Sequence, residues 1–302
     1  MIDIIITSFH EPKSTERAVQ AFLRQKISGN FRITIVDPFP DVQQYLKKHI
    51  KNKKVKFFLD PGEGKSYALN LLFQEYGSSN TDDIFILTDG DVYVSDHAVA
   101  EIVKVFRDKK IACVTGKPVS LDSSHMKYGF WAQVAFEGID RVRRRLSQEK
   151  KFFECSGYLF ALRKGVILDF PLETSEDSIV PYLFWKKGYK IAYAERATVY
   201  VKNPSTWKDY LAQKIRNIKA HENLTTLAPD MPRTKSFFNE IKEGAFFALL
   251  QPKTFMQFVW IIELYFARLF IYLKAFLELA KKKTYQDGWR EQATTETTKM
   301  ED

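Results

Sequence analysis

The stretch DIFILTDGD, residues 83–91, places an apolar run directly before two carboxylates, Asp89 and Asp91. A short apolar run that ends in polar residues is typical of a buried β-strand. Because one glycine separates the two aspartates, their oxygens can reach a single hard cation, and Mg²⁺ or Mn²⁺ prefers oxygen ligands. A metal held there would stabilise a departing diphosphate as a Lewis acid. A turn built on Asp-Gly chemistry is the alternative interpretation.

Short apolar runs of the same kind occur on both sides of this stretch. They predict four further strands, at residues 2–7, 31–37, 55–59 and 111–115. Helical stretches lie between most of them, and strands that alternate with helices predict an α/β fold with a largely parallel sheet. Ligands bind at the carboxyl ends of the strands in such sheets. Since three strands end at Thr7-Ser8, Asp37 and Asp89, we expect polar groups to gather at one edge.

The regular alternation of predicted strands and helices ends after about residue 120. A predicted helix carries a basic cluster, which consists of Arg141, Arg143, Arg144 and Arg145. This cluster indicates either a solvated helix face or a surface for anionic lipid, where each basic residue contributes about 1 kcal/mol. The elements predicted next are a strand at residues 155–162, a helix at 176–187, a strand at 190–193 and a helix at 204–224.

The last part of the chain is rich in aromatic residues and predicts helices at residues 237–250 and 255–280. The second helix is long enough to span a bilayer, but four charged residues fall on one of its faces. These residues are Glu263, Arg268, Lys274 and Glu278. The pattern favours an amphipathic helix in a membrane interface, closed by basic residues 281–283, over a membrane span or a soluble core or dimer helix. We assign residues 229–283 to membrane-associating helices and residues 284–302 to a disordered tail.

The composition narrows the classes of partner. The chain has 302 residues, 45% of them hydrophobic, and a formal net charge of +9. That charge suits nucleic acid, an anionic membrane or a phosphate-bearing substrate. The basic residues are not interleaved with aromatic ones on the predicted strands, as a nucleic-acid platform requires, so we expect no nucleic-acid partner. Cys113 and Cys155 have no neighbour at zinc spacing, which indicates a reducing compartment. The first residues resemble a strand and not a signal peptide.

A second acidic pair, Glu176-Asp177, begins a predicted helix in the later half of the chain. A carboxylate at this place can act as a general base on a hydroxyl group. Together with Ser175, the pair also suits the N-terminus of any helix, where acidic residues favour the helix dipole. Both interpretations stay open on the residues alone.

The segment GEGKS, residues 62–66, resembles a phosphate-binding P-loop. The full pattern needs a glycine where this chain has Leu59, so we interpret the segment as a glycine-rich turn that opens a helix. Lys65 can still face a diphosphate from such a turn.

Taken together, these motifs resemble glycosyltransferase family 2, whose members have the nucleotide-diphospho-sugar transferase fold. The resemblance covers about residues 2–220 and consists of short pieces in the family's order. The pieces are IITSFHE at residues 5–11, VD at 36–37, GKSYALN at 64–70, DGD at 89–91, VTG at 114–116, CSGYLF at 155–160, ED at 176–177 and GYKI at 188–191. In the first piece, His10 replaces the family's usual asparagine.

The resemblance implies a Rossmann-like, mostly parallel central sheet in two halves. Residues 1–120 would bind the nucleotide sugar, and residues 121–228 would bind the acceptor and hold the catalytic base. The residues that it implies are Ser8, Glu11 and Asp37 for the base and ribose, Asp89 and Asp91 for the diphosphate and metal, and Asp177 for the catalytic base.

One departure from the family concerns the acceptor. Chain-extending members carry Gln-x-x-Arg-Trp near a membrane, whereas this chain has Gln213 and Arg216 followed by Asn217. That tryptophan lines the acceptor site of processive members, so its absence favours the transfer of a single sugar. Arg216 is then either a contact of the diphosphate or a cation on a helix surface. His221 either completes the metal shell or is structural.

The sequence therefore predicts an inverting, metal-dependent glycosyltransferase that uses Mg²⁺ or Mn²⁺ and a nucleotide-sugar donor, with UDP favoured by the family. The expected acceptor is a lipid-linked or membrane-proximal glycan in polysaccharide biosynthesis. We expect a peripheral or monotopic protein on the cytoplasmic face of a membrane. One alternative is sugar transfer to polyprenyl phosphate, with the phosphate on the basic cluster. The other is a non-catalytic nucleotide-sugar-binding protein, against which the three carboxylates argue.

Overall fold

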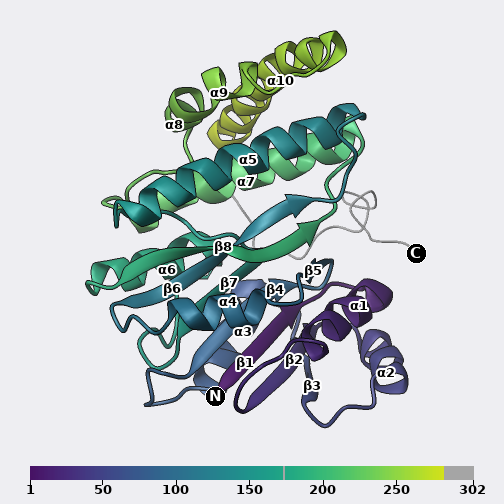
Figure 1. Cartoon of the computed structure of the whole chain (residues 1–302), viewed down its shortest axis with the longest axis vertical. Coiled ribbons are helices and arrows are strands. Elements are labelled where there is room, and N and C mark those ends of the chain that lie inside the picture. The colour runs from purple at the N-terminus through teal and green to yellow at the C-terminus, as the bar shows by residue number, and fades with distance from the viewer. Residues whose placement is uncertain (173, 282–302) are drawn as a thin grey trace.

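Eight strands form a single sheet in the order β3-β2-β1-β4-β7-β6-β8-β5 in the computed structural model, which describes residues 1–172 and 174–281 (Figure 1). The strands are β1 (Ile2–Thr7), β2 (Phe31–Asp37), β3 (Val55–Leu59), β4 (Ile84–Asp89), β5 (Val92–Val94), β6 (Ile111–Ser120), β7 (Leu159–Arg163) and β8 (Lys190–Val201). The helices are α1 (Pro12–Leu23), α2 (Pro40–His49), α3 (Lys65–Glu75), α4 (Ala98–Val105), α5 (Lys127–Gln148), α6 (Glu176–Lys186), α7 (Trp207–Leu227), α8 (Phe237–Glu240), α9 (Phe246–Leu249) and α10 (Phe255–Ala280), with a π-helical turn, η1 (Ile241–Ala245), between α8 and α9.

The predicted α/β fold is confirmed, and its parallel half lies in the first part of the chain. β1 pairs in parallel with β2 and with β4, and β2 pairs in parallel with β3. Ile4, Ile5 and Ile6 of β1 are fully buried, although successive side chains of a strand point to opposite faces. Both faces of the sheet are therefore covered, which explains why these strands are continuous apolar runs.

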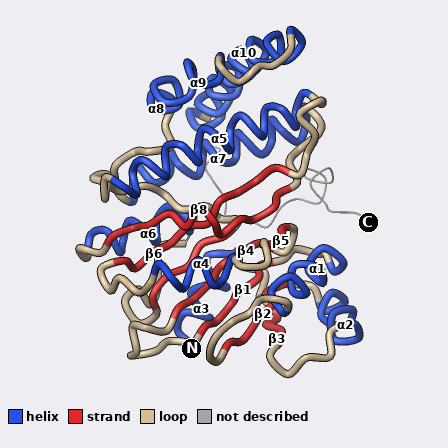
Figure 2. The backbone as a smooth tube through the Cα atoms, viewed as in Figure 1, coloured by secondary structure: helices blue, strands red, loops and turns tan. Residues whose placement is uncertain are grey.

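The second half of the sheet is mixed. β7 lies antiparallel between β4 and β6, β8 runs parallel to β6, and β5 pairs antiparallel with β8 (Figure 2). Four of the seven strand pairs are thus parallel. β7 begins at Leu159 instead of the predicted residue 155, because residues 155–158 form the turn that enters it. β8 continues to Val201, well beyond the predicted residue 193.

A layer of two long helices, α5 and α7, lies between the sheet and the C-terminal helices (Figure 1). Its buried contacts with α10 are apolar and aromatic: Trp131 of α5 and Tyr210 of α7 share a buried cluster with Ile261 and Ile271 of α10. The Trp131 indole also donates a 2.7 Å hydrogen bond to the carbonyl oxygen of Trp260. The C-terminal helices are therefore docked on α5 and α7.

The C-terminal helices differ from the prediction in one way and show which side of α10 meets the domain. The helix predicted at residues 237–250 is broken into α8, the π-helical turn and α9. Three of the four charged residues predicted on one face of α10 pair with the domain: Arg268 with Glu240, Glu278 with Lys219, and Glu263 with Lys127. The predicted basic residues 282–283 and the tail at residues 284–302 lie outside the described part of the chain.

Two of the glycines with a positive φ differ, because a side chain would overlap a neighbouring atom at only one of them. Gly165 has φ +73°, and an added Cβ would overlap the carbonyl oxygen of Ser78, whereas one at Gly188, with φ +85°, would have no described atom within 4 Å. We expect Gly188→Ala to lower the free energy of unfolding by about 1 kcal/mol. Gly165→Ala should lower it by about 2 kcal/mol more, because a backbone oxygen cannot move aside. Urea unfolding measures both, and equal losses would contradict the overlap.

Candidate functional site

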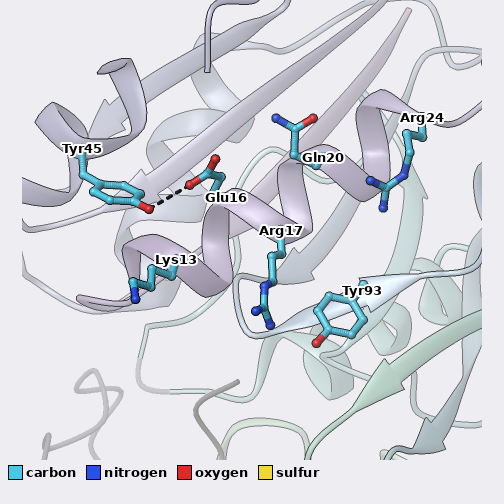
Figure 3. A pocket seen from close by; sticks show the side chains of 7 residues that line it. All are labelled: Lys13, Glu16, Arg17, Gln20, Arg24, Tyr45 and Tyr93. Atoms are coloured by element: carbon cyan, nitrogen blue, oxygen red, sulfur yellow. Dashed lines mark hydrogen bonds between the residues drawn. The ribbon is translucent and has the colours of Figure 1, made fainter. Parts of the chain in front are cut away.

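A cleft runs along the carboxyl edge of the sheet and is closed on its other side by α5 and α7. It collects most of the residues that the sequence singled out. Its lining includes Ser8, Glu11, Lys65, Asp89, Asp91, Arg143, Gly157, Glu176, Asp177, Lys214, Arg216, His221 and Lys235. Asp37 lies beneath this lining. A second hollow lies on α1 and is lined by charged and aromatic side chains such as Glu16, Arg17 and Tyr45 (Figure 3). None of the predicted site residues lines that second hollow.

The two aspartates of the metal motif lie where β4 ends beside β1. Asp89 is the register partner of Thr7, and its Oδ1 accepts hydrogen bonds from Thr7 Oγ1 at 3.1 Å and from Lys65 Nζ at 2.8 Å. Gly90 is required between the aspartates, because a Cβ there would lie 2.8 Å from Thr15 Oγ1 and 3.0 Å from Ser8 Cβ. The glycine therefore lets the end of β4 press against the loop after β1.

The donor atoms at this place fit a hard divalent cation. Asp89 and Asp91 both line the cleft, and within the described residues Asp89 Oδ2 accepts no hydrogen bond. The described side chains include no group of three or more His, Cys, Asp or Glu that could hold a metal on their own. A metal on two carboxylates would keep coordination positions for phosphate oxygens, as Mg²⁺ usually does.

Asp37 organises the predicted nucleoside end of the cleft from below. Its Oδ2 accepts hydrogen bonds from Ser8 Oγ at 2.7 Å and from the His10 backbone at 3.0 Å, and its Oδ1 accepts one from the Phe39 backbone at 2.8 Å. Burial raises the pKa of Asp37, although the hydrogen bond from Ser8 opposes the rise. His10 adopts the left-handed conformation with φ 56°, and its ring lies 4.5 Å from that of Phe39. The predicted contact of Asp37 with ribose stays a prediction.

Lys65 joins the two halves of the cleft. Its ammonium lies 2.8 Å from Asp89 Oδ1 and 2.6 Å from Glu176 Oε1. Burial acts to lower the pKa of Lys65, but the two carboxylates outweigh it and raise that pKa. Burial raises the pKa of Glu176 even though Lys65 opposes the rise. The two acidic residues at 176–177 therefore have different partners. Glu176 pairs with Lys65, whereas Asp177 contacts the groups described next.

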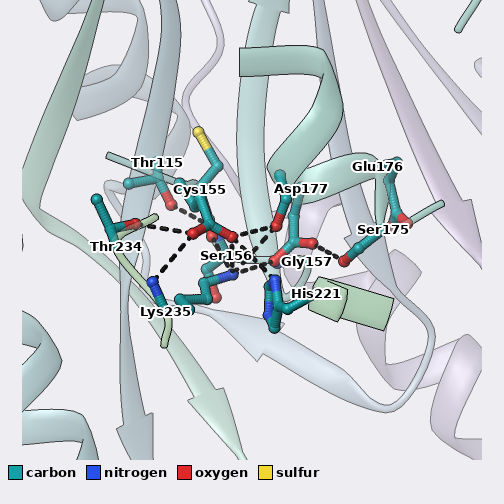
Figure 4. A network of polar contacts seen from close by, with 12 residues as sticks. Thr115, Cys155, Ser156, Gly157, Ser175, Glu176, Asp177, His221, Thr234 and Lys235 are labelled. Atoms are coloured by element: carbon teal, nitrogen blue, oxygen red, sulfur yellow. Dashed lines mark hydrogen bonds and ion pairs between the residues drawn. The ribbon is translucent and has the colours of Figure 1, made fainter. Parts of the chain in front are cut away.

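Asp177 lies in the first turn of α6, with its carboxylate anchored on both oxygens (Figure 4). Oδ1 accepts a hydrogen bond from Ser175, and Oδ2 accepts bonds of 3.2 Å from the Gly157 backbone and of 3.2 Å from Lys235 Nζ. Burial acts to raise the pKa of Asp177, but Lys235, the hydrogen bond from Ser175 and His221 together outweigh it and leave that pKa well below the usual range. Asp177 is therefore ionised at neutral pH.

Two residues that the sequence analysis missed complete this network, Glu154 and Lys235. Glu154 is 3% exposed, and it accepts hydrogen bonds from Thr234 Oγ1 at 2.8 Å and from the Lys235 backbone at 3.2 Å. Burial would raise its pKa, but Lys235 and His221 lower it to about 2. The one sequence signal for Glu154 is a carboxylate directly after the apolar pair at residues 152–153.

His221 lies beside Glu154, with Nδ1 3.2 Å from a Glu154 oxygen. Burial lowers its pKa, which favours the neutral imidazole. The predicted role of His221 as a ligand of a metal at Asp89 and Asp91 stays a prediction. Arg216 lines the same cleft from α7, and its predicted contact with a diphosphate stays a prediction. Lys214 also lines the cleft, and burial together with the nearby charge of Arg268 lowers its pKa to about 8.

Comparison with known proteins gives this arrangement a family. The family model described as "Glycosyltransferase like family 2" matches residues 2–220, well over half of the chain. The chain belongs to glycosyltransferase family 2. The resemblance inferred from the short motifs is thereby confirmed, and so is the class of enzyme, a glycosyltransferase of the hexosyltransferase type that uses a nucleotide sugar.

Among solved structures, the chain is similar to "Mannosyltransferase PcManGT from Pyrobaculum calidifontis in complex with GDP-Man and Mn2+". The TM-score is 0.58 at 16% sequence identity, and the match covers 92% of this chain and 80% of that chain. At this identity the likeness establishes the fold. No curated protein matches the sequence.

Removal of Lys65 should make stability depend on pH through Glu176. In Lys65→Met, burial keeps the folded-state pKa of Glu176 above its ordinary value of 4.5. A raised folded-state pKa contributes stability that is present below the unfolded pKa and is lost as pH rises. We therefore expect Lys65→Met to lose about 3 kcal/mol at pH 8 and much less at pH 4.5, as measured by urea unfolding.

The double variant Lys65→Met/Glu176→Gln is the matched control for this ion pair. It removes the Glu176 carboxylate, which the loss of Lys65 leaves unpaired, so most of the loss in the free energy of unfolding at pH 8 should disappear. A loss of the same size in both variants at both pH values would contradict the assignment of this pH dependence to Glu176.

Proposed function

We propose that the protein is an inverting, metal-dependent glycosyltransferase that transfers one sugar from a nucleotide-diphosphate donor to a lipid-linked or membrane-proximal glycan. The observation that carries this proposal is the convergence of Asp89, Asp91 and Asp177 on one cleft at the carboxyl edge of the sheet. Ligands of open α/β sheets bind at that edge. Family membership supports the nucleotide-sugar donor, and the family resemblance favours UDP.

Asp89 and Asp91 are the residues that would hold Mg²⁺ or Mn²⁺. When bound, the metal would supply a Lewis acid for the negative charge of the departing diphosphate. The presence of Mn²⁺ and GDP-Man in the mannosyltransferase structure makes a divalent ion reasonable here. Lys65 and Arg216 lie on the same cleft and would bind the diphosphate as cations. Ser8 and Glu11 would contact the nucleoside, with Asp37 holding Ser8 in place.

Asp177 is the proposed general base. Its ionised carboxylate can accept the proton of an acceptor hydroxyl while the hydroxyl oxygen attacks the anomeric carbon. The bond to the diphosphate oxygen breaks on the opposite side, and its electron pair leaves with the nucleoside diphosphate. A single displacement of this kind inverts the anomeric configuration, so an α-linked donor gives a β-linked product.

The proposal is tested with a panel of nucleotide sugars and Mn²⁺ or Mg²⁺, by measuring the nucleoside diphosphate that is released. We expect release from one donor and its loss with EDTA or in Asp91→Ala, because the metal site is removed. Asp177→Asn should lower the transfer rate by about 10²- to 10⁴-fold and leave donor binding unchanged. Asp96→Asn, which alters an exposed aspartate outside the cleft lining, is the matched control. An Asp177→Asn variant with the full transfer rate would exclude the base assignment.

Membrane association is proposed from the outward side of α8, α9 and α10. By length and composition, α10 could cross a membrane, but three of its charges form ion pairs with the domain. The side of α10 that faces away from the domain is apolar. The large apolar residues exposed on these helices and the loops next to them include Phe238, Phe246, Leu250, Phe255, Met256, Phe258, Phe266, Leu269, Phe270, Leu273, Phe276 and Leu277. An exposed patch of this size marks an interaction site.

The partner that fits this surface is a lipid bilayer. A helix that keeps one side on its own domain and presents the other as an apolar face suits in-plane binding, with the apolar face sunk about 5–10 Å into the lipid boundary. Exposed Lys242, Lys253 and Lys281 lie on or next to the same helices and would face anionic headgroups. This supports a peripheral or monotopic protein, which we place on the cytoplasmic face.

Vesicle binding tests this surface. The double variant Phe266→Asn/Leu273→Asn removes two exposed apolar side chains, so we expect binding to anionic phosphatidylglycerol vesicles to weaken at least tenfold. The matched control is Leu168→Asn, which alters a side chain that is also exposed, at 53%, but lies outside the C-terminal helices. Co-sedimentation measures both. Equal binding by the double variant and the wild type would contradict the membrane surface.

One observation favours the alternative acceptor, a polyprenyl phosphate. Of the four arginines in the basic cluster of α5, Arg143 enters the cleft. Acid treatment of the product separates the two reactions, because a sugar on a phosphate is acid-labile and a glycosidic linkage is much less so. The non-catalytic alternative has no comparable support, since a binding protein needs no base at Asp177.

A further inference from the structure

Arg143 differs from the other arginines of the basic cluster. Arg141 and Arg145 pair with Glu243, and Arg144 pairs with Asp140 at 2.9 Å and with Glu195 at 3.0 Å. These three side chains are about half exposed. Arg143 is 6% exposed and lines the cleft.

The Arg143 guanidinium is buried without a counter-ion. Its Nη2 donates a 2.7 Å hydrogen bond to the carbonyl oxygen of Cys155. Within the described residues its Nη1 has no hydrogen-bond partner, and no carboxylate lies within 4.0 Å of the guanidinium. A buried charge without a partner costs several kcal/mol, so this position is suited to an anion that is not part of the chain.

Lys235 brings a second cation to the same point. Its Nζ lies 3.5 Å from the Cys155 carbonyl oxygen that Arg143 also contacts, and 3.2 Å from Asp177 Oδ2. The two cations therefore converge next to the proposed base. The neighbouring residues Ser156 and Gly157 line the cleft at this place.

We propose that Arg143, together with Lys235, binds a phosphate group in the part of the cleft beside Asp177. A guanidinium presents a planar set of donors that matches phosphate oxygens, and an ammonium adds a point charge. This inference rests on the proposed glycosyltransferase function and extends it by naming a chemical group of the substrate. The phosphate belongs either to the acceptor or to the diphosphate of the donor.

The surroundings of Arg143 favour a phosphate on the acceptor. Ile139 and Phe136 line the cleft from the same helix, four and seven residues before Arg143, which places the three side chains along one face. An apolar strip that ends at a buried cation suits an amphiphile with a hydrocarbon chain and a phosphate head. The donor diphosphate already has Lys65 and Arg216 as candidate contacts elsewhere in the cleft.

The test compares Arg143→Gln and Arg143→Lys with Arg144→Gln, a matched charge removal outside the cleft. Binding of farnesyl phosphate and of UDP with Mn²⁺ is measured by isothermal titration, with farnesol as the uncharged form of the first probe. We expect farnesyl phosphate to bind the wild type and Arg144→Gln equally. It should bind Arg143→Gln at least tenfold more weakly and Arg143→Lys with intermediate affinity, while farnesol binding and UDP binding stay the same in all variants.

Each other outcome has a defined meaning. If Arg143→Gln weakens UDP binding and not farnesyl phosphate binding, the phosphate site stands and its ligand is the donor. If Arg143→Gln weakens the binding of neither farnesyl phosphate nor UDP, the phosphate site is overturned. Metal-dependent UDP binding that is lost in Asp91→Ala keeps the proposed function intact in that case. Should Arg143→Gln fail to fold by circular dichroism, Arg143→Lys carries the same comparison.

Discussion

The Lys65 ammonium between Asp89 and Glu176 is the interaction on which the site depends. It joins the end of β4, the start of α3 and the start of α6, three segments that are far apart in the chain. Glu176 is followed directly by Asp177, so the same contact sets the position of the proposed base relative to the metal motif. A largely buried ammonium shared by two carboxylates is stable only while all three groups stay together, which makes the two halves of the cleft one unit.

The sequence predicted the parts of this site that follow from a repeating pattern. The strands at β1, β2 and β4 are apolar runs with polar ends, and parallel pairing necessarily brings those ends together, so the meeting of Ser8, Asp37 and Asp89 could be expected. Glu154 and Lys235 could not be predicted in the same way. Each is a single residue outside any motif, and its role comes from partners in other segments: Glu154 meets His221, Ser178 and Thr234.

The C-terminal helix shows another limit of sequence reasoning. Charge periodicity correctly placed Glu263, Arg268 and Glu278 on one side of α10, but periodicity does not say which side meets the domain. Partners in α5, α7 and α8 decide it, because Lys127, Lys219 and Glu240 neutralise those charges. These ion pairs therefore join the buried apolar residues of α10 in attaching it to the domain, and the side turned outward is apolar.

The layer formed by α5 and α7 sets the distance between the membrane surface and the cleft. It has the thickness of one helix, and packed helix axes are about 8–10 Å apart. With α10 half sunk in the lipid boundary as proposed, the next layer of helices stands at the level of the headgroups, and the cleft that α5 and α7 line is directly behind that layer. A substrate with its reactive end at the headgroup plane is then within reach, while one buried among the acyl chains or carried far into the water is not. The stacking of the helices would thus restrict the acceptors to those whose reactive end lies at the level of the headgroups, whatever contacts the side chains of the cleft then make.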